Sequence, residues 1–216
     1  MNVKTKVDRI VAFGDSQTYG YYLTSENKGY GTSCHKDAWP GKLSSLLNIP
    51  VINNGVCGAS NKEIWLEAIQ FDYKPNDIVC ILWSFFDRDF FPNGDTQDNI
   101  LGFYGHYLGK KLIPNYYTDV SNTSYYKNLH TNFNSLLNFS LYKTQLASHL
   151  NYNNIPYIFM NLEVSNMPKN SFEWDRVNCY SINYVLNDFA NDNSHYGTQS
   201  HCYVAEEFKR KINAEN

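Results

Sequence analysis

Short apolar runs alternate with amphipathic segments along most of the chain. The apolar runs are rich in β-branched and aromatic residues, which is typical of buried strands. They cover Arg9–Phe13, Pro50–Asn53, Asp77–Trp83 and Pro156–Asn161. The other segments predict helices over Trp39–Leu47, Asn61–Phe71, about Asn138–Leu150, about Asn178–Phe189 and Gln199–Ile212. Because alternating buried strands and helices form parallel sheets covered by helices, the pattern predicts an α/β fold.

Residues from about 87 to 135 interrupt this alternation. The stretch is rich in Tyr, Asn, Phe and Gly and shows no clean period. We interpret it as a long insertion over the edge of the sheet, since long loops in compact domains are usually lids, binding loops or disordered segments. Its aromatic content argues against full disorder. The length of 216 residues predicts one domain over 1–216, with this insertion inside it.

Composition disfavours several kinds of partner. The net charge is −3 and no basic block occurs, so we expect no nucleic-acid partner. The first eight residues lack the apolar core of a signal peptide, and no apolar run is long enough to span a membrane. We therefore expect a cytoplasmic protein without a membrane partner. Five cysteines without C-x-x-C spacing predict reduced thiols and no structural zinc site.

A serine follows the first predicted strand directly, within Phe13–Gly20 (FGDSQTYG). The turn places Ser16 at the carboxyl edge of the sheet, where open α/β folds bind ligands. A serine hydroxyl is a weak nucleophile and needs a base. Asp192 and His195 lie three residues apart on a predicted loop, so the carboxylate could orient the imidazole and the imidazole could activate the serine. A rival base, His201, is expected to lie at the start of the last predicted helix. There it is expected to pack against the sheet or to cap the first turn of that helix.

These segments resemble the sequence blocks of the SGNH (GDSL-like) hydrolases, a family of esterases and lipases. Gly14–Gly20 is similar to the first block, GDSxTxG, and Asn53–Asn61 resembles the second. Asp192–His195 matches the last block, DxxH. The resemblance covers nearly the whole chain except the insertion. It implies a flavodoxin-like three-layer α/β/α sandwich with a central parallel sheet.

The resemblance also implies roles for individual residues. Ser16 corresponds to the nucleophile, His195 to the base and Asp192 to the carboxylate that orients it. The backbone amides of Ser16 and Gly58 correspond to donors of the oxyanion hole. No metal and no organic cofactor are implied.

The third block departs from the family pattern. The family has Gly-x-Asn-Asp after the third strand, whereas this chain has Ser84–Asp87 (SFFD). Phe86 stands where the asparagine would donate a hydrogen bond, and losing one such donor typically costs about 10²–10³ in rate. Either two backbone amides, one from each of the first two blocks, hold the oxyanion alone, or the side chain of Ser84 or Arg88 replaces the missing asparagine as a donor.

Four residues near the same edge are candidates for binding substrate. They are Asn61, Phe85, Phe86 and Arg88. Each has a structural alternative, since Asn61 could cap the helix that follows it and the phenylalanines could belong to the core.

The expected function is a serine esterase that transfers a small acyl group, in the first instance acetyl, from a carbohydrate ester to water. Aromatic rings stack on sugar rings and amides bind hydroxyls, which favours a carbohydrate for an insertion rich in both. A lipase or short-chain acyl esterase fits the same chemistry. Phe86 instead favours a weak or inactive carbohydrate-binding or structural module with this fold. A thiol enzyme using Cys57 or Cys202 is a further alternative, although neither cysteine lies beside a recognisable base.

Overall fold

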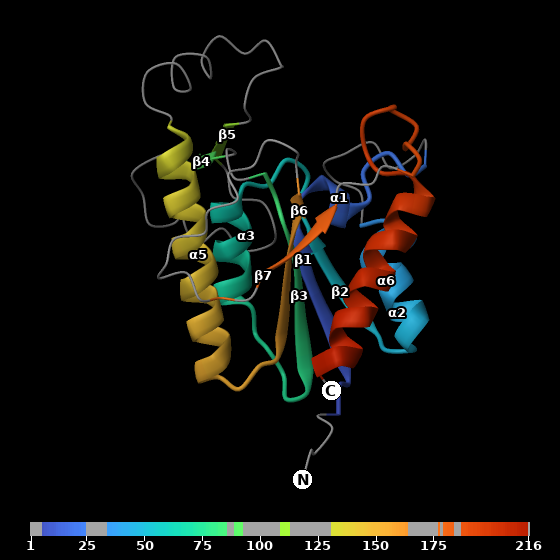
Figure 1. The fold of residues 1–216 in the computed structure, drawn as a ribbon, viewed down its shortest axis with the longest axis horizontal. Coiled ribbons are helices and arrows are strands. Elements are labelled where there is room, and N and C mark those ends of the chain that lie inside the picture. The colour runs from blue at the N-terminus through green and yellow to red at the C-terminus, as the bar shows by residue number, and fades with distance from the viewer. Residues whose placement is uncertain are drawn as a thin grey trace.

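The centre of the molecule is a parallel sheet of five strands in the order β2-β1-β3-β6-β7 (Figure 1). In this computed structural model, residues 6–24, 34–85, 89–92, 109–112, 131–163, 177, 179–183 and 187–215 are described. The strands are β1 (Arg9–Gly14), β2 (Val51–Gly55), β3 (Asp77–Trp83), β6 (Tyr157–Glu163) and β7 (Cys179–Asn183). This order is the flavodoxin-like arrangement, in which the sheet reverses direction of growth at β1.

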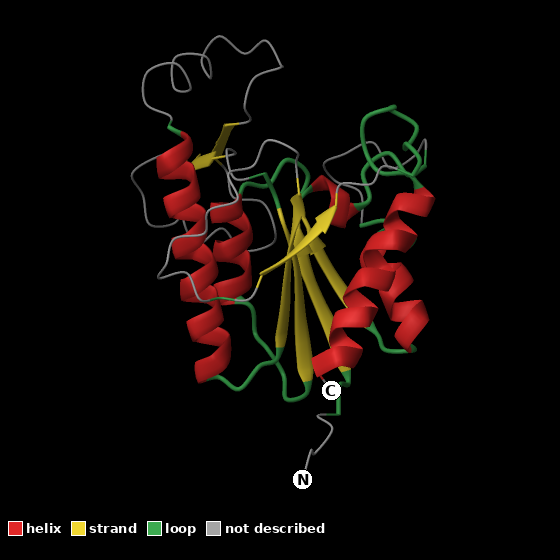
Figure 2. Ribbon diagram, in the orientation of Figure 1, coloured by secondary structure: helices red, strands yellow, loops and turns green. Residues whose placement is uncertain are grey.

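Helices cover both faces of the sheet and complete three layers (Figures 1 and 2). The helices α2 (Trp39–Leu47) and α6 (Thr198–Glu215) lie on one face, and α3 (Asn61–Gln70) and α5 (Asn132–Tyr152) on the other. Alternate residues of β1 serve the two cores: Ile10 and Ala12 face the α2/α6 side, and Val11 and Phe13 the α3/α5 side. The predicted three-layer α/β/α sandwich is therefore confirmed.

Most predicted elements are present, with one clear error. The helix predicted at about Asn178–Phe189 is wrong, because Cys179–Asn183 forms β7. This strand extends the sheet by pairing in parallel with β6, with Phe159 opposite Cys179. Pairing with a distant segment decides its conformation, and local periodicity cannot reveal such pairing. Helix α5 also begins earlier than predicted, at Asn132, where the hydroxyl of Thr131 accepts the Asn134 amide over 3.1 Å.

Part of the segment predicted as an insertion, 87–135, belongs to the described residues. It contributes β4 (Asp89–Pro92) and β5 (Gly109–Leu112), which pair as an antiparallel ribbon, and the start of α5. The rest of the insertion lies outside the described residues, as do Phe86 and Arg88. The single-domain organisation stays a prediction.

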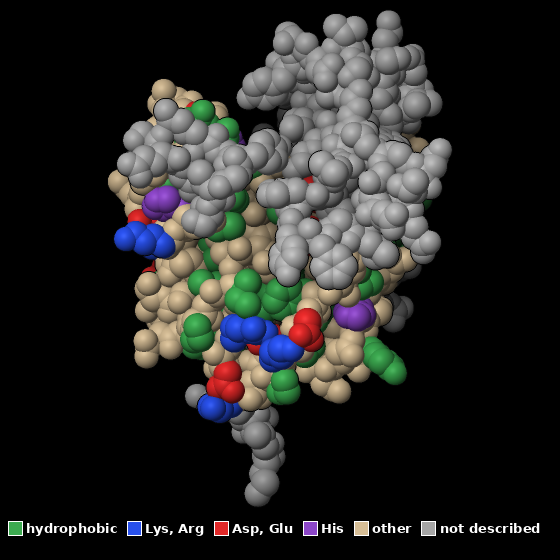
Figure 3. Space-filling model, turned by 180° about the vertical axis from the view of Figure 1, so that it is seen from behind, with side chains coloured by type: hydrophobic (Ala, Val, Ile, Leu, Met, Phe, Trp, Pro, Cys, Tyr) green, Lys and Arg blue, Asp and Glu red, His purple; other side chains and the backbone are tan. Residues whose placement is uncertain are grey.

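On the rear face of the molecule, basic side chains lie beside acidic ones, and its described residues form no continuous basic patch (Figure 3). One pair ties the amino ends of two neighbouring strands, because Arg9 on β1 donates to both carboxylate oxygens of Asp77 on β3, over 2.8 and 2.6 Å. Of the helices described, none has the length and apolar character to cross a membrane.

Candidate active site

The turn after β1 holds Ser16 at the first position of a single helical turn, α1 (Ser16–Tyr19). Asp15 caps this turn: its Oδ1 accepts the Gln17 amide over 2.9 Å, and its backbone carbonyl accepts the amides of Thr18 and Tyr19. Asp15 therefore braces the turn that carries Ser16. Glycine is required before it, because a Cβ on Gly14 would lie 1.9 Å from Thr18 Oγ1.

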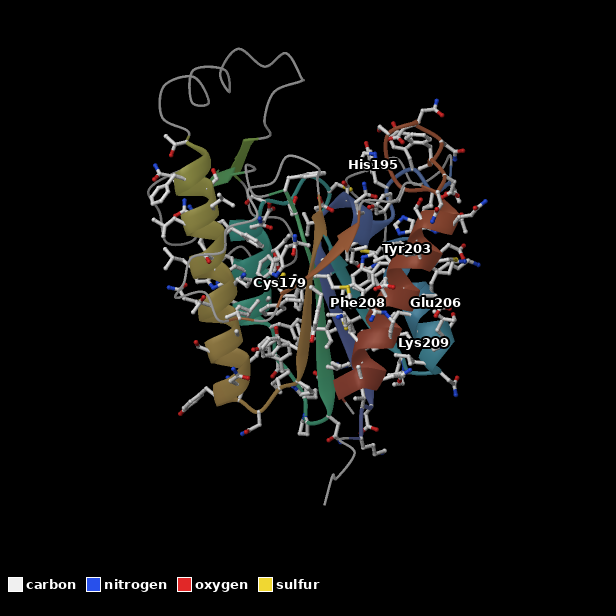
Figure 4. All side chains as sticks on the ribbon, in the orientation of Figure 1. Cys179, His195, Tyr203, Glu206, Phe208 and Lys209 are labelled. Atoms are coloured by element: carbon white, nitrogen blue, oxygen red, sulfur yellow. The ribbon has the colours of Figure 1, made fainter. Side chains whose placement is uncertain are left out.

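His195 lies in the loop that precedes α6, above the carboxyl ends of the strands (Figure 4). Its Nε2 is 3.0 Å from Ser16 Oγ, and its Nδ1 is 2.5 Å from Asp192 Oδ2. The three residues predicted to act together therefore meet, although 179 positions separate Ser16 from His195. Both distances are within the reach required of a general base and the group that orients it.

Asp192 receives hydrogen bonds on both carboxylate oxygens. Its Oδ1 accepts the backbone amides of Ser194 and His195, and its Oδ2 accepts the Ser194 hydroxyl over 2.8 Å. Partial burial alone would raise the pKa of Asp192, but the bonds from His195 and Ser194 outweigh it and hold the pKa well below its usual value. The ionised carboxylate favours a proton on His195 Nδ1, which leaves the Nε2 lone pair facing Ser16.

His201, the rival base, is committed elsewhere. It lies in α6, is 1% exposed, and its Nδ1 accepts the Trp39 amide at the start of α2 over 3.1 Å. Burial lowers the pKa of His201 to about 3, so the ring is neutral over the physiological range. The sequence predicts that His201 packs against the sheet or caps the first turn of its own helix, whereas the helix whose amide it accepts is α2.

The turn after β2 carries Gly58 to the same edge of the sheet. Gly14 and Gly55 are opposite each other in the β1–β2 register, and the Val56 amide donates to the Gly14 carbonyl over 3.0 Å. The Ala59 amide closes the turn on the Val56 carbonyl, and Gly58 occupies its third position with φ of 71°. That left-handed conformation favours glycine and is typical of a type II turn.

Ser84 is not placed as an oxyanion donor. Its hydroxyl donates to Asp15 Oδ2 over 2.9 Å, so its single hydroxyl proton points at the helix cap and not at the reacting oxygen. This arrangement contradicts the prediction that the Ser84 hydroxyl replaces the missing asparagine as a donor. Arg88 lies outside the described residues.

Asn61 lies at the start of α3, and its contact with substrate stays a prediction. Ser60 is the N-cap of α3, accepting the Glu63 amide over 3.3 Å, so the alternative that Asn61 caps this helix is wrong. The buried Asn61 side chain instead donates to the Ser84 carbonyl over 3.1 Å and thereby joins α3 to the end of β3. Phe85, which follows Ser84 in the chain, is half-buried at the same edge of the sheet.

Two contacts of the site have no signal in the sequence. The ring of Tyr21 lies edge-on to the His195 imidazole, with centroids 4.9 Å apart, and burial raises the pKa of Tyr21 to about 12. The side-chain carbonyl of Gln17 accepts the Tyr196 amide over 3.1 Å. In each contact the two residues lie far apart in the sequence. Tyr21 lies outside the first block, and Gln17 occupies the position that the block leaves variable.

The described residues contain no group of three His, Cys, Asp or Glu side chains that could hold a metal ion. All five cysteines are free thiols.

Comparison with solved structures gives three informative similarities. Est24, a carbohydrate acetylesterase from Sinorhizobium meliloti, is 11% identical over 96% of this chain and 99% of its own, with a TM-score of 0.56. Est2A, an acetyl xylan esterase from Butyrivibrio proteoclasticus, is 12% identical over 100% of this chain and 65% of its own, with a TM-score of 0.56. A protein of the G-D-S-L family from Desulfitobacterium hafniense is 16% identical over 95% of this chain and 99% of its own, with a TM-score of 0.50.

The chain has the fold of the SGNH hydrolases. At these low identities the similarity establishes the fold, and the resemblance in the sequence blocks is consistent with it. No protein-family model and no curated protein sequence matches the chain.

Proposed function

We propose that the protein is a serine ester hydrolase of the SGNH type, with Ser16 as nucleophile, His195 as base and Asp192 as its orienting carboxylate. The observation that carries the proposal is the pair of distances at His195, 3.0 Å from Nε2 to Ser16 Oγ and 2.5 Å from Nδ1 to Asp192 Oδ2. Together they supply a nucleophile, a base and a fixed tautomer.

The reaction begins when Ser16 Oγ attacks the ester carbonyl carbon and its proton passes to His195 Nε2. Asp192 stabilises the imidazolium that results. When the tetrahedral intermediate collapses, the bond to the alcohol breaks and the departing oxygen takes the proton from Nε2. Water then attacks the acyl group on Ser16, gives a proton to the same nitrogen, and releases the acid while the proton returns to the serine oxygen.

Backbone amides supply the oxyanion hole in this proposal. The backbone amides of Gln17, Thr18 and Tyr19 all donate to Asp15. The first four amides of a helix have no partner within it, and the one that remains here, that of Ser16, is assigned to the oxyanion. The Gly58 amide is assigned as the second donor, because its turn is joined to the end of β1 and its own N–H is not the one that closes that turn.

The proposed substrate is a small acyl ester, in the first instance an acetyl group on a carbohydrate. Est24 and Est2A, which share the fold, are a carbohydrate acetylesterase and an acetyl xylan esterase. A short-chain acyl ester of another alcohol undergoes the same steps. Comparing acetylated xylan with 4-nitrophenyl esters of two to twelve acyl carbons ranks these possibilities by kcat/KM.

The deciding experiment is hydrolysis of 4-nitrophenyl acetate by the wild type and by Ser16→Ala. We expect the wild type to be active and the variant to be at the background rate. Ser148→Ala is the matched control, since this exposed hydroxyl on α5 bonds only locally to the Thr144 carbonyl. Equal rates for wild type and Ser16→Ala overturn the proposal and favour the non-enzymatic module. Loss of activity after thiol alkylation of Ser16→Ala would favour the thiol enzyme.

A further inference from the structure

Two neighbouring contacts join the start of α1 to the loop before α6. His195 reaches Ser16, and the next residue, Tyr196, donates its backbone amide to the side-chain oxygen of Gln17. Both contacts span 179 positions, so the two segments lie in a fixed register, residue against residue. One contact is the proposed catalytic pair, and the other involves no reacting atom.

The Gln17 contact is buried, whereas the catalytic pair is partly open to solvent. Gln17 is 5% exposed and Tyr196 is 1% exposed. Water cannot easily replace a lost acceptor at such a site, so the Tyr196 amide depends on the glutamine oxygen. The backbone of Gln17 is fixed as well, because its own amide donates to Asp15.

Two further backbone hydrogen bonds hold this loop. The Asn191 amide donates to the Tyr22 carbonyl over 3.1 Å, four residues before His195. The His195 carbonyl accepts the Ala190 amide over 2.9 Å, which closes the loop on itself but does not tie it to α1. The Tyr21 ring packs against the imidazole from one side. The hydrogen bond to Gln17 fixes the backbone at the residue next to the histidine.

We infer that Gln17 is a positioning residue, whose side-chain amide holds the His195 loop at the distance at which Nε2 reaches Ser16 Oγ. The inference rests on the proposed hydrolase function, and it assigns a role to a position that the first block leaves variable. Gln17 touches neither the substrate nor the transferred proton. It acts by fixing the backbone one residue from the base.

The physical basis is the steep dependence of proton transfer on geometry. A displacement of about 1 Å between base and nucleophile can cost roughly 10²-fold in rate. Binding of substrate at the rest of the site does not depend on this contact. Loss of the Gln17 acceptor is therefore expected to lower kcat and to leave KM nearly unchanged.

The test compares Gln17→Met, Gln17→Ala and Gln17→Glu with the wild type in the hydrolysis of 4-nitrophenyl acetate, with rates expressed per folded molecule from circular dichroism. Methionine keeps the length but not the amide oxygen. Alanine removes the whole side-chain amide without adding bulk and serves if Gln17→Met does not fold. Glutamate keeps an oxygen acceptor in either protonation state. Gln199→Met, at an exposed position of α6, is the matched control.

We expect Gln17→Met and Gln17→Ala to lower kcat by about 10- to 100-fold with KM changed by less than about threefold. Gln17→Glu is expected to restore kcat to within about fivefold of the wild type, and Gln199→Met to match the wild type. The inference is overturned if the folded Met and Ala variants keep wild-type kcat, or if Gln17→Glu is as slow as they are. A wild type without Ser16-dependent hydrolysis defeats the proposed function itself, which is a separate result.

Discussion

Ser84 donates its hydroxyl proton to Asp15 over 2.9 Å and so joins the end of β3 to the cap of the Ser16 turn. Ser84 stands where the third block of the SGNH family has glycine, two residues before Phe86. Both carboxylate oxygens of Asp15 are thus engaged, one by the Gln17 amide and one by this hydroxyl. The departure in the third block therefore coincides with an added support for the turn that carries Ser16.

Ser84→Ala is expected to destabilise the protein. The change leaves the buried Asp15 Oδ2 without this donor, which costs about 1–3 kcal/mol in the free energy of unfolding. We also expect kcat for 4-nitrophenyl acetate to fall, since the cap orients the turn that carries Ser16. Urea denaturation measures the first effect and initial rates the second.

Ser148→Ala controls for the loss of a hydroxyl, because that side chain is exposed and bonds only to the Thr144 carbonyl within α5. Its free energy of unfolding should stay within about 0.5 kcal/mol of the wild type. If Ser84→Ala behaves like this control, the support of Asp15 by Ser84 is unimportant for stability.

Asp192→Asn tests the carboxylate in the proposed triad. Asparagine can donate a hydrogen bond toward His195 Nδ1, which favours the tautomer whose proton sits on Nε2 and cannot accept the Ser16 proton. We expect kcat to fall by roughly 10³–10⁴-fold with little change in KM. Asp72→Asn, on an exposed carboxylate at the opposite end of the sheet, should leave kcat unchanged. A loss of less than tenfold in Asp192→Asn would mean that His195 is oriented by other contacts.

Several features of the fold and site are predictable because their signals are local. The apolar run over Arg9–Phe13 and the glycine, acid and serine that follow specify a strand and a turn without help from the rest of the chain. The pairing of Asp192 with His195 is local too, since the two residues lie three positions apart on one loop. Their meeting with Ser16 was expected because parallel strands bring their carboxyl ends to one edge.

Other features depend on contacts between segments far apart in the sequence. Cys179–Asn183 becomes a strand because β6 offers an unpaired edge, and nothing in its own periodicity specifies this. The Ser84 hydroxyl meets Asp15 across 69 positions, and Gln17 meets Tyr196 across 179. Such polar contacts depend on the final geometry of the turns. A serine or glutamine in the sequence gives no sign of its partner.

The buried His201 predicts a specific loss of stability in acid. Burial lowers the pKa of its ring to about 3 in the folded protein, whereas an unfolded histidine titrates near 6.5. The unfolded state therefore binds a proton between these two values and the folded state does not. The contribution is fully present above pH 6.5 and declines as the pH falls toward 3, by about 1.4 kcal/mol per pH unit.

His201→Asn removes this titration and keeps an acceptor for the Trp39 amide, whose bond to His201 Nδ1 is 3.1 Å long. The free energy of unfolding, measured by urea denaturation between pH 6.5 and 4.5, should fall more steeply with acid in the wild type than in the variant. This window lies above the range in which Asp192, whose pKa is below its usual value, takes up a proton. Equal slopes for the two proteins would show that His201 accepts a proton in the folded state, and its ring would then have to turn away from the Trp39 amide.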